Sequence, residues 1–175
     1  MKTKVFNEGG NHMSVSFIRV DDRMIHGQTC TRWALEYPCE GIVAVNDAAA
    51  NNSVLKAAYK SASGKKTFVW TMEDWKKKCK KVLDSDTRYF LITKNPIDMK
   101  NILVDQKFEC GIKKVIIGPC NDRPRSVKLG NNQSITQEEA DALEAIAQAG
   151  YDVEFRLIPD ESIGNWDKFK GQFGY

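Results

Sequence analysis

The chain has 175 residues, of which 42% are hydrophobic and 28% are charged. This length predicts one domain that buries its own core without help from disulfides or metals. The formal net charge is only +3, and this excess comes from one group of five lysines: Lys76, Lys77, Lys78, Lys80 and Lys81. The rest of the chain therefore lacks the broad positive charge that is typical of a protein that binds nucleic acid.

Residues 1–13 are polar and lack periodicity, and we interpret them as a flexible extension that precedes a domain over residues 14–175. The N-terminus has no apolar segment of the kind that a secretory signal requires. No apolar run reaches the roughly 18 residues that cross a bilayer, so no membrane-spanning helix is expected.

Short β-prone runs alternate with amphipathic helical patterns along the rest of the chain. Strands are predicted at six places: 15–20, 42–45, 67–71, 89–93, 115–117 and 151–158. Helices are predicted where apolar residues recur three and four positions apart: 30–37, 52–64, 72–82, 95–103 and 136–150. Residues 119–134 are expected to form an irregular loop with a short strand near 127–129, and the segment after Pro159 a short terminal helix and tail.

Local signals mark two helix starts. Asn95 and Pro96 are suited to the N-cap and the first helical position, and Thr136 opens a capping box that Glu139 completes. The helix that starts near residue 52 is expected to bury four side chains: Val54, Leu55, Ala58 and Ala62.

The strict β-α alternation predicts an α/β fold, namely a single-domain open, mainly parallel sheet with helices on both faces. Such sheets bind ligands at the carboxyl ends of their strands. Candidate site residues are therefore expected directly after the strands: 21–28, 46–51, 71–73, 93–95 and 118–125.

One of these loops combines residue types that suit the transfer of a phosphoryl group. It holds His26, the only histidine of the predicted domain, whose neutral ring is nucleophilic near pH 7. Arg23 supplies a fork of donors for phosphoryl oxygens, and Gly27 leaves the backbone N–H open to an anion. Gln28 adds a donor at the start of the predicted helix.

A neighbouring carboxylate is needed to fix the tautomer of the ring, and either Asp21 or Asp22 is suitably placed. The alternative is a loop histidine that only makes hydrogen bonds, with Asp22 and Arg23 as a surface ion pair. The usual glycine motifs for dinucleotides and nucleoside triphosphates are missing, and the five cysteines form no C-x-x-C pair. We therefore expect neither a cofactor nor a metal site.

The segment Ile18–Gln28, followed by Trp33, resembles the active-site segment of IIB components of the bacterial sugar phosphotransferase system (PTS), mannose/fructose/sorbose family. Weaker similarities extend this resemblance over most of residues 15–160: Ile42–Asp47, Phe90–Pro96, Ile135–Glu139 and Gly150–Pro159. The chain departs from the family pattern in loops beside the predicted crevice, for example at Ala48–Asn52 and Gly118–Cys120.

The resemblance implies an open α/β fold and a cytoplasmic phosphotransferase that associates peripherally with membrane partners. His26 would accept phosphate from a phosphohistidine of a IIA donor and pass it to a sugar transported by IIC and IID subunits. Arg23 would clamp the phosphate, and either Asp21 or Asp22 would belong to the site. Further contributors would be Arg19, Gln28 and Asp47. The alternative is a regulatory or ligand-binding paralogue that transfers no phosphate to a sugar.

Overall fold

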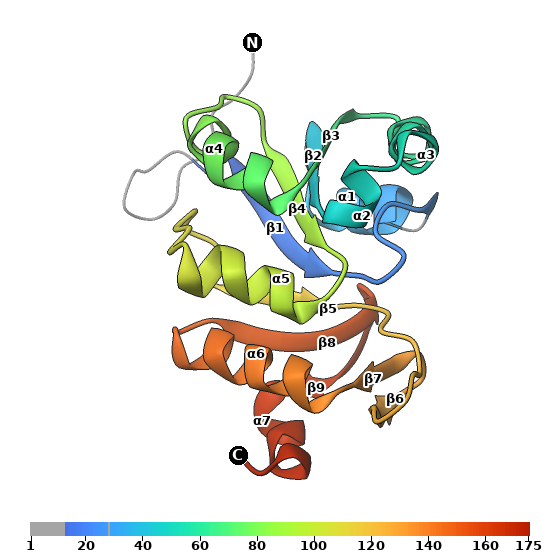
Figure 1. The fold of residues 1–175 in the computed structure, drawn as a ribbon, viewed down its shortest axis with the longest axis vertical. Coiled ribbons are helices and arrows are strands. Elements are labelled where there is room, and N and C mark those ends of the chain that lie inside the picture. Colours follow the sequence, from blue (N-terminus) through green and yellow to red (C-terminus); the bar gives the residue numbers. More distant parts are fainter. Residues whose placement is uncertain (1–12, 28) are drawn as a thin grey trace.

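The structure, a computed structural model, describes residues 13–27 and 29–175. Apart from Met13, the predicted extension over residues 1–13 therefore lies outside the described residues. The described chain forms one seven-stranded sheet with the strand order β3-β2-β4-β1-β5-β8-β9 (Figure 1). The strands are β1 (Val15–Val20), β2 (Gly41–Val45), β3 (Lys66–Trp70), β4 (Tyr89–Thr93), β5 (Lys114–Ile117), β8 (Asp152–Ile158) and β9 (Glu161–Asn165).

The six strands predicted from the sequence are present and pair in parallel. Every residue of β1, β2 and β4 is buried, because helices cover both faces of the sheet and leave these central strands no solvent-facing side. This is why β2 and β4 read as nearly continuous apolar runs rather than as an alternation of apolar and polar residues, whereas β1 also buries the polar Ser16 and Arg19. The predicted fold class is confirmed.

Helices cover both faces of the sheet. Phe17, Ile42 and Phe90 pack on one face against Trp33 and Leu55, and the opposite face packs against the other helices. Two helical segments lie on the first face. One is a π-helix (Thr29–Trp33) that continues as α1 (Ala34–Glu36), and the other is α3 (Ser53–Ser63). The second carries α4 (Met72–Leu83), α5 (Pro96–Lys100) with a π-helical extension (Asn101–Asp105), α6 (Gln137–Gln148) and α7 (Trp166–Phe169).

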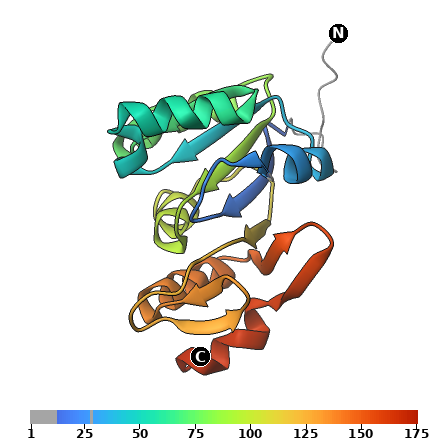
Figure 2. The ribbon, with the colours of Figure 1, turned by 90° about the vertical axis from the view of Figure 1, so that its right-hand side faces the viewer.

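Smaller elements complete the chain. Short α2 (Asp47–Ala50) follows β2, β6 (Val127–Gly130) and β7 (Gln133–Ile135) form a separate hairpin, and a 3-10 turn (Lys170–Phe173) follows α7. Figures 1 and 2 place α7 at the opposite end of the molecule from α3 and α4. Among the described residues, no helix is long and apolar enough to span a membrane.

The predicted helix starts are confirmed. The Asn95 side chain accepts from the backbone N of Asp98, with Pro96 at the first helical position. Both hydrogen bonds of the Thr136–Glu139 capping box are present. These caps satisfy backbone N–H groups that the first helical turn leaves without an intrahelical partner.

Two expectations were wrong. In α3, Val54 is 78% exposed, and Ala58 and Ala62 are exposed too, because the side that packs on the sheet is formed by Leu55 and Tyr59, four residues apart.

The terminal segment contains β9, which pairs antiparallel with β8 and was not predicted. Its polar sequence Glu-Ser-Ile-Gly-Asn lacks a strand signal, because an edge strand of a hairpin is partly solvated.

Candidate functional site

The loop after β1 is fastened to the ends of two neighbouring strands. The backbone N of Asp21 donates to Thr93 O at the end of β4 (3.0 Å), and the N of Asp22 donates to Pro119 O after β5 (2.9 Å). After β1 the chain continues on the face of the sheet that α1 covers, whereas after β4 it continues on the opposite face, which α5 covers. The carboxyl ends of these adjacent strands therefore border the crevice where open α/β sheets bind ligands.

A tight turn then reverses the chain. The backbone N of Met24 donates to Asp21 O (2.9 Å), and Met24 has a positive φ of 54° although it is not a glycine. Its fully buried side chain holds the residue in this uncommon conformation. The turn brings His26 back towards the end of β1.

His26 meets Asp21 at the centre of the site. Its Nε2 lies 3.0 Å from Oδ2 of Asp21, whose carboxylate is fully buried, while the His26 side chain is 20% exposed. An ionised carboxylate only accepts hydrogen bonds, so Nε2 carries the hydrogen of the neutral ring. The lone pair of the neutral ring is then on Nδ1.

The two aspartates have different partners. Asp21 Oδ1 also accepts from the backbone N of Arg23 (3.0 Å), which keeps both its oxygens within the site. Asp22 Oδ2 instead accepts from the backbone N of Asn121 (2.7 Å). Asp21 is thus the aspartate that contacts the imidazole, and Asp22 ties the loop to the segment after β5.

Arg19 supports Asp21 from inside the protein. Its Nε and Nη2 each lie 3.3 Å from Asp21 Oδ2, and the side chain is 1% exposed. Burial lowers the pKa of Arg19 to about 10, although Asp21 opposes this shift, so the guanidinium stays charged at neutral pH. Arg19 thus neutralises the Asp21 carboxylate and is not available to a ligand.

The end of β8 fixes the position of Arg19. Its Nη1 donates to Arg156 O (3.0 Å) and its Nη2 to Leu157 O (3.2 Å). The guanidinium also lies 4.3 Å from the ring centroid of Trp33, whose Nε1 donates to the same Leu157 O. The sequence gives no indication of these β8 contacts, because backbone acceptors leave no residue-type signature.

Gly118 makes this arrangement possible. A Cβ at residue 118 would lie 2.3 Å from Nη2 of Arg19. A glycine directly after a strand is a sequence signal for such a close approach.

We expect Gly118→Ala to lower the free energy of unfolding by about 2–4 kcal/mol, because the methyl group displaces a buried charged side chain from its partners. Urea denaturation measures the loss. Gly171→Ala is the matched control, since a Cβ there meets no atom within 4 Å. Equal stability of the two variants would mean that Arg19 can move without cost.

Arg23 and Gly27 are the exposed members of the loop. Within the described chain, the Arg23 guanidinium has no carboxylate or hydrogen-bond partner, so it is free to bind an anion. A Cβ on Gly27 would meet nothing within 4 Å, so the fold itself does not require a glycine there. Gln28 lies outside the described residues.

Asp47 belongs to a different contact. Its Oδ1 accepts from the backbone N of Met72 (2.7 Å) and so joins the loop after β2 to the start of α4. It is not part of the hydrogen-bonded group around His26.

A cavity of about 410 Å³ opens beside the loop at the carboxyl ends of β1, β4 and β5. Its arginine, Arg123, forms an ion pair with Glu139 of α6 and is thereby held in the wall. Burial raises the pKa of the Cys120 thiol, which keeps it protonated and excludes it as a thiolate nucleophile. Lys94 is the exposed cation of this cavity.

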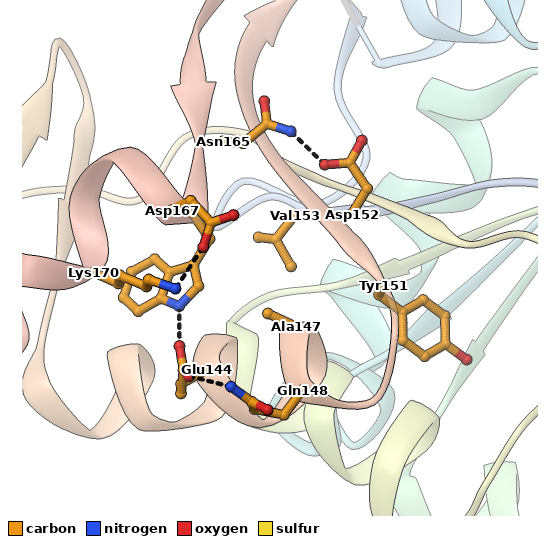
Figure 3. A pocket seen from close by; sticks show the side chains of 10 residues that line it. Glu144, Ala147, Gln148, Tyr151, Asp152, Val153, Asn165, Asp167 and Lys170 are labelled. Atoms are coloured by element: carbon orange, nitrogen blue, oxygen red, sulfur yellow. Dashed lines mark hydrogen bonds and ion pairs between the residues drawn. The ribbon is translucent and has the colours of Figure 1, made fainter. Parts of the chain in front are cut away.

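A second cavity, of about 250 Å³, lies between α6, α7 and the start of β8 (Figure 3). Three pairs of its side chains bind one another: Trp166 with Glu144, Asn165 with Asp152, and Lys170 with Asp167. Because these polar groups are already partnered, and because the cavity lies at the amino end of β8, we assign it no role at the His26 site.

The chain is similar to proteins that share one family description. A family model described as the PTS system sorbose subfamily IIB component matches residues 15–173. The chain is 25% identical over 154 residues to the fructose-specific EIIB component of Bacillus subtilis, covering 86% of this chain and 91% of that protein. It is also 25% identical over 152 residues to the mannose-specific EIIAB component of Escherichia coli K12, covering 85% and 46%.

A solved structure shares the fold. The IIBSor domain of the sorbose permease from Klebsiella pneumoniae superposes with a TM-score of 0.80 at 24% identity, over 91% of this chain and 98% of that one. The family model covers nearly the whole described domain, including the His26 loop. The chain therefore belongs to the sorbose-subfamily IIB components of the phosphotransferase system.

Proposed function

We propose that this chain carries phosphate on His26, accepting it from a phosphohistidine of a IIA partner and passing it to a sugar. The observation that carries the proposal is the contact between His26 Nε2 and the buried Asp21 carboxylate, which leaves Nδ1 as the nucleophile. Membership of a IIB family supports phosphate transfer, and the EIIAB name of the Escherichia coli relative supports a IIA donor.

The first transfer exchanges one P–N bond for another. The Nδ1 lone pair of His26 attacks phosphorus, the bond to the donor imidazole breaks, and the donor ring keeps the bonding electron pair. Asp21 stabilises the Nε2–H as positive charge develops on the ring of His26. Arg23 then binds the phosphoryl oxygens through charge-assisted hydrogen bonds.

The second transfer regenerates the neutral ring. A sugar hydroxyl attacks phosphorus, the P–N bond breaks, and Nδ1 recovers its electron pair and takes up the hydroxyl proton. The imidazolium formed in this way then loses that proton to solvent, which restores the neutral ring with its hydrogen on Nε2. In this proposal Gly27 and Gln28 border the phosphate, Arg19 holds Asp21 in place, and Asp22 fastens the loop. The sugar is presented by IIC and IID membrane subunits, so the domain works in the cytoplasm at their surface.

A chase experiment tests this function. The protein is phosphorylated by phosphoenolpyruvate through the general phosphotransferase proteins and a IIA donor, then mixed with vesicles that contain IIC and IID and a candidate sugar. We expect the phosphate to leave His26 and to appear on the sugar. Phosphoprotein that persists although vesicles and sugar are active with another IIB component would contradict transfer and favour a regulatory paralogue.

Arg23→Ala is expected to slow phosphorylation about 10–100-fold, because it removes charge-assisted hydrogen bonds to the phosphoryl group. Its side chain is exposed, so the thermal midpoint should stay that of the parent chain. Arg125→Ala, which removes an exposed arginine of the loop after β5, is the control and should leave the rate within about twofold. A fall in midpoint as large as that of a core variant would show that Arg23 is structural.

A further inference from the structure

A groove of about 410 Å³ lies between α4 and the edge strand β3. Among the described residues, no acidic side chain lines it. Three aromatic and three lysine side chains do, together with Val82 and Ser85: Phe68, Trp70, Tyr89, Lys66, Lys78 and Lys81. The groove thus combines an apolar floor with a rim of one charge.

The floor is made by alternate residues of β3. Phe68 and Trp70 project from the same side of the strand, and their ring centroids lie 5.1 Å apart. Both side chains are only partly buried although they pack against the core. No described strand covers the outer edge of β3, where the sheet ends.

The segment that forms the rim has an excess of positive charge. Residues 60–90 contain nine basic and four acidic residues, a net +5, whereas the whole chain carries +3. Lys78 pairs with Asp74 (3.0 Å), but within the described chain Lys77, Lys80 and Lys81 have no carboxylate partner. Lys76 pairs with Glu73 (3.8 Å), so three of the five lysines of this group keep a charge that no carboxylate of the described chain pairs.

We propose that this groove docks an extended acidic segment of a partner protein, which lays an aromatic or aliphatic side chain on Phe68 and Trp70. Lys66 stands at the first residue of β3 and Lys78 beside its last, so the cations are spread over about 13 Å of strand. That spacing suits carboxylates distributed along a chain. The free edge of β3 offers backbone groups for strand addition.

Two other classes of partner fit less well. Nucleic acid carries a phosphate at every nucleotide, but the chain outside residues 60–90 has a net charge of −2 (+3 minus +5) and so offers no wider basic surface that could follow a phosphate backbone. A lipid bilayer is flat, whereas the apolar side chains here lie in a concave groove.

The groove is separate from the His26 loop. β3 and β1 are three strand positions apart in the sheet, which is about 14 Å. A partner bound here leaves His26 accessible to a second protein. The inference goes beyond the proposed phosphate transfer and does not depend on it.

The probe for the test is a fluorescently labelled random copolymer of glutamate and tyrosine, whose binding is followed by anisotropy at low and high salt. We expect salt-sensitive binding that weakens about fivefold or more in Lys66→Gln/Lys81→Gln. The matched control Lys107→Gln/Lys128→Gln removes two exposed lysines elsewhere and should change binding less than about twofold. An equal effect of the two double variants would overturn the proposal.

A second variant tests the apolar floor. Phe68→Leu is expected to reduce the preference for the glutamate–tyrosine copolymer over polyglutamate, while circular dichroism confirms the fold. If Phe68→Leu kept the parent chain's preference for the glutamate–tyrosine copolymer over polyglutamate, the apolar floor would have no role in binding. Stronger binding of single-stranded DNA or anionic phospholipid vesicles, lost in Lys66→Gln/Lys81→Gln, would reassign the groove to another class of partner. Neither assay reads phosphorylation, so failure here is distinct from failure of the proposed function.

Discussion

A His26→Gln variant is expected to fold as the parent chain does and to accept no phosphoryl group from an active donor. Glutamine can still donate to Asp21, and the His26 side chain is partly exposed, so the free energy of unfolding should change by less than about 1 kcal/mol. Its amide nitrogen, however, has no basic lone pair with which to attack phosphorus. Intact-mass spectrometry after incubation with the donor system measures the loss.

The second histidine of the chain provides the control. His12→Gln should gain the mass of one phosphoryl group as the parent protein does, since His12 precedes the domain that the family model matches. Phosphorylation of His26→Gln at the parent rate would assign the phosphate to another residue.

Asp21→Asn is expected to slow phosphorylation by about 10²–10⁴-fold, because an amide can donate to Nε2 and so stabilise the wrong tautomer of His26. The change also leaves Arg19 buried without its counter-charge, which costs about 3–5 kcal/mol of stability. The rate must therefore be measured at a temperature at which circular dichroism shows the variant folded.

Asp22→Asn is the matched comparison, because it makes the same chemical change one residue away. Asp22 contacts the backbone of Asn121 and not the imidazole, so we expect a loss of less than about tenfold. If both variants lost activity equally in the folded state, the carboxylate of Asp21 would have no special role in orienting the ring.

The fold follows from patterns that are local in the sequence. Nearly continuous apolar runs mark β2 and β4, and short apolar stretches mark β1, because helices cover both faces of the sheet. The caps at Asn95 and Thr136 are formed by residues within three positions of each other, which is why they can be read from the sequence. β9 cannot be predicted from its own sequence, because its five mostly polar residues form a strand only through their pairing with β8.

The site is predictable only in part, because only contacts between residues that are close in the sequence leave a local pattern. The residues of the His26 loop are contiguous, so their chemistry is visible, but the sequence leaves open which aspartate meets the ring. The turn at Met24 selects Asp21. The support that Arg19 receives from Arg156 and Leu157 joins residues 137 and 138 positions apart, and no local pattern predicts it.

Three charges at the end of β1 and in the loop after it have different surroundings. Arg19 is buried and neutralises Asp21, Asp21 holds Nε2 of His26, and Arg23 faces solvent. A buried ion pair of this kind adds little net stability but fixes the orientation of the group it contacts. In the proposed function, the exposed Arg23 is the cation that binds the phosphate.

The central claim is that Asp21 holds Nε2 of His26 so that Nδ1 carries the phosphate, and ¹⁵N-histidine NMR tests it most directly. The chain has two histidines, so the signals of His12 and His26 are assigned by comparison with the spectrum of the His12→Gln variant. Before phosphorylation we predict the Nε2–H tautomer for His26, and afterwards a phosphorus coupling at Nδ1. A coupling at Nε2, or an unmodified His26 in phosphorylated protein, would contradict the account.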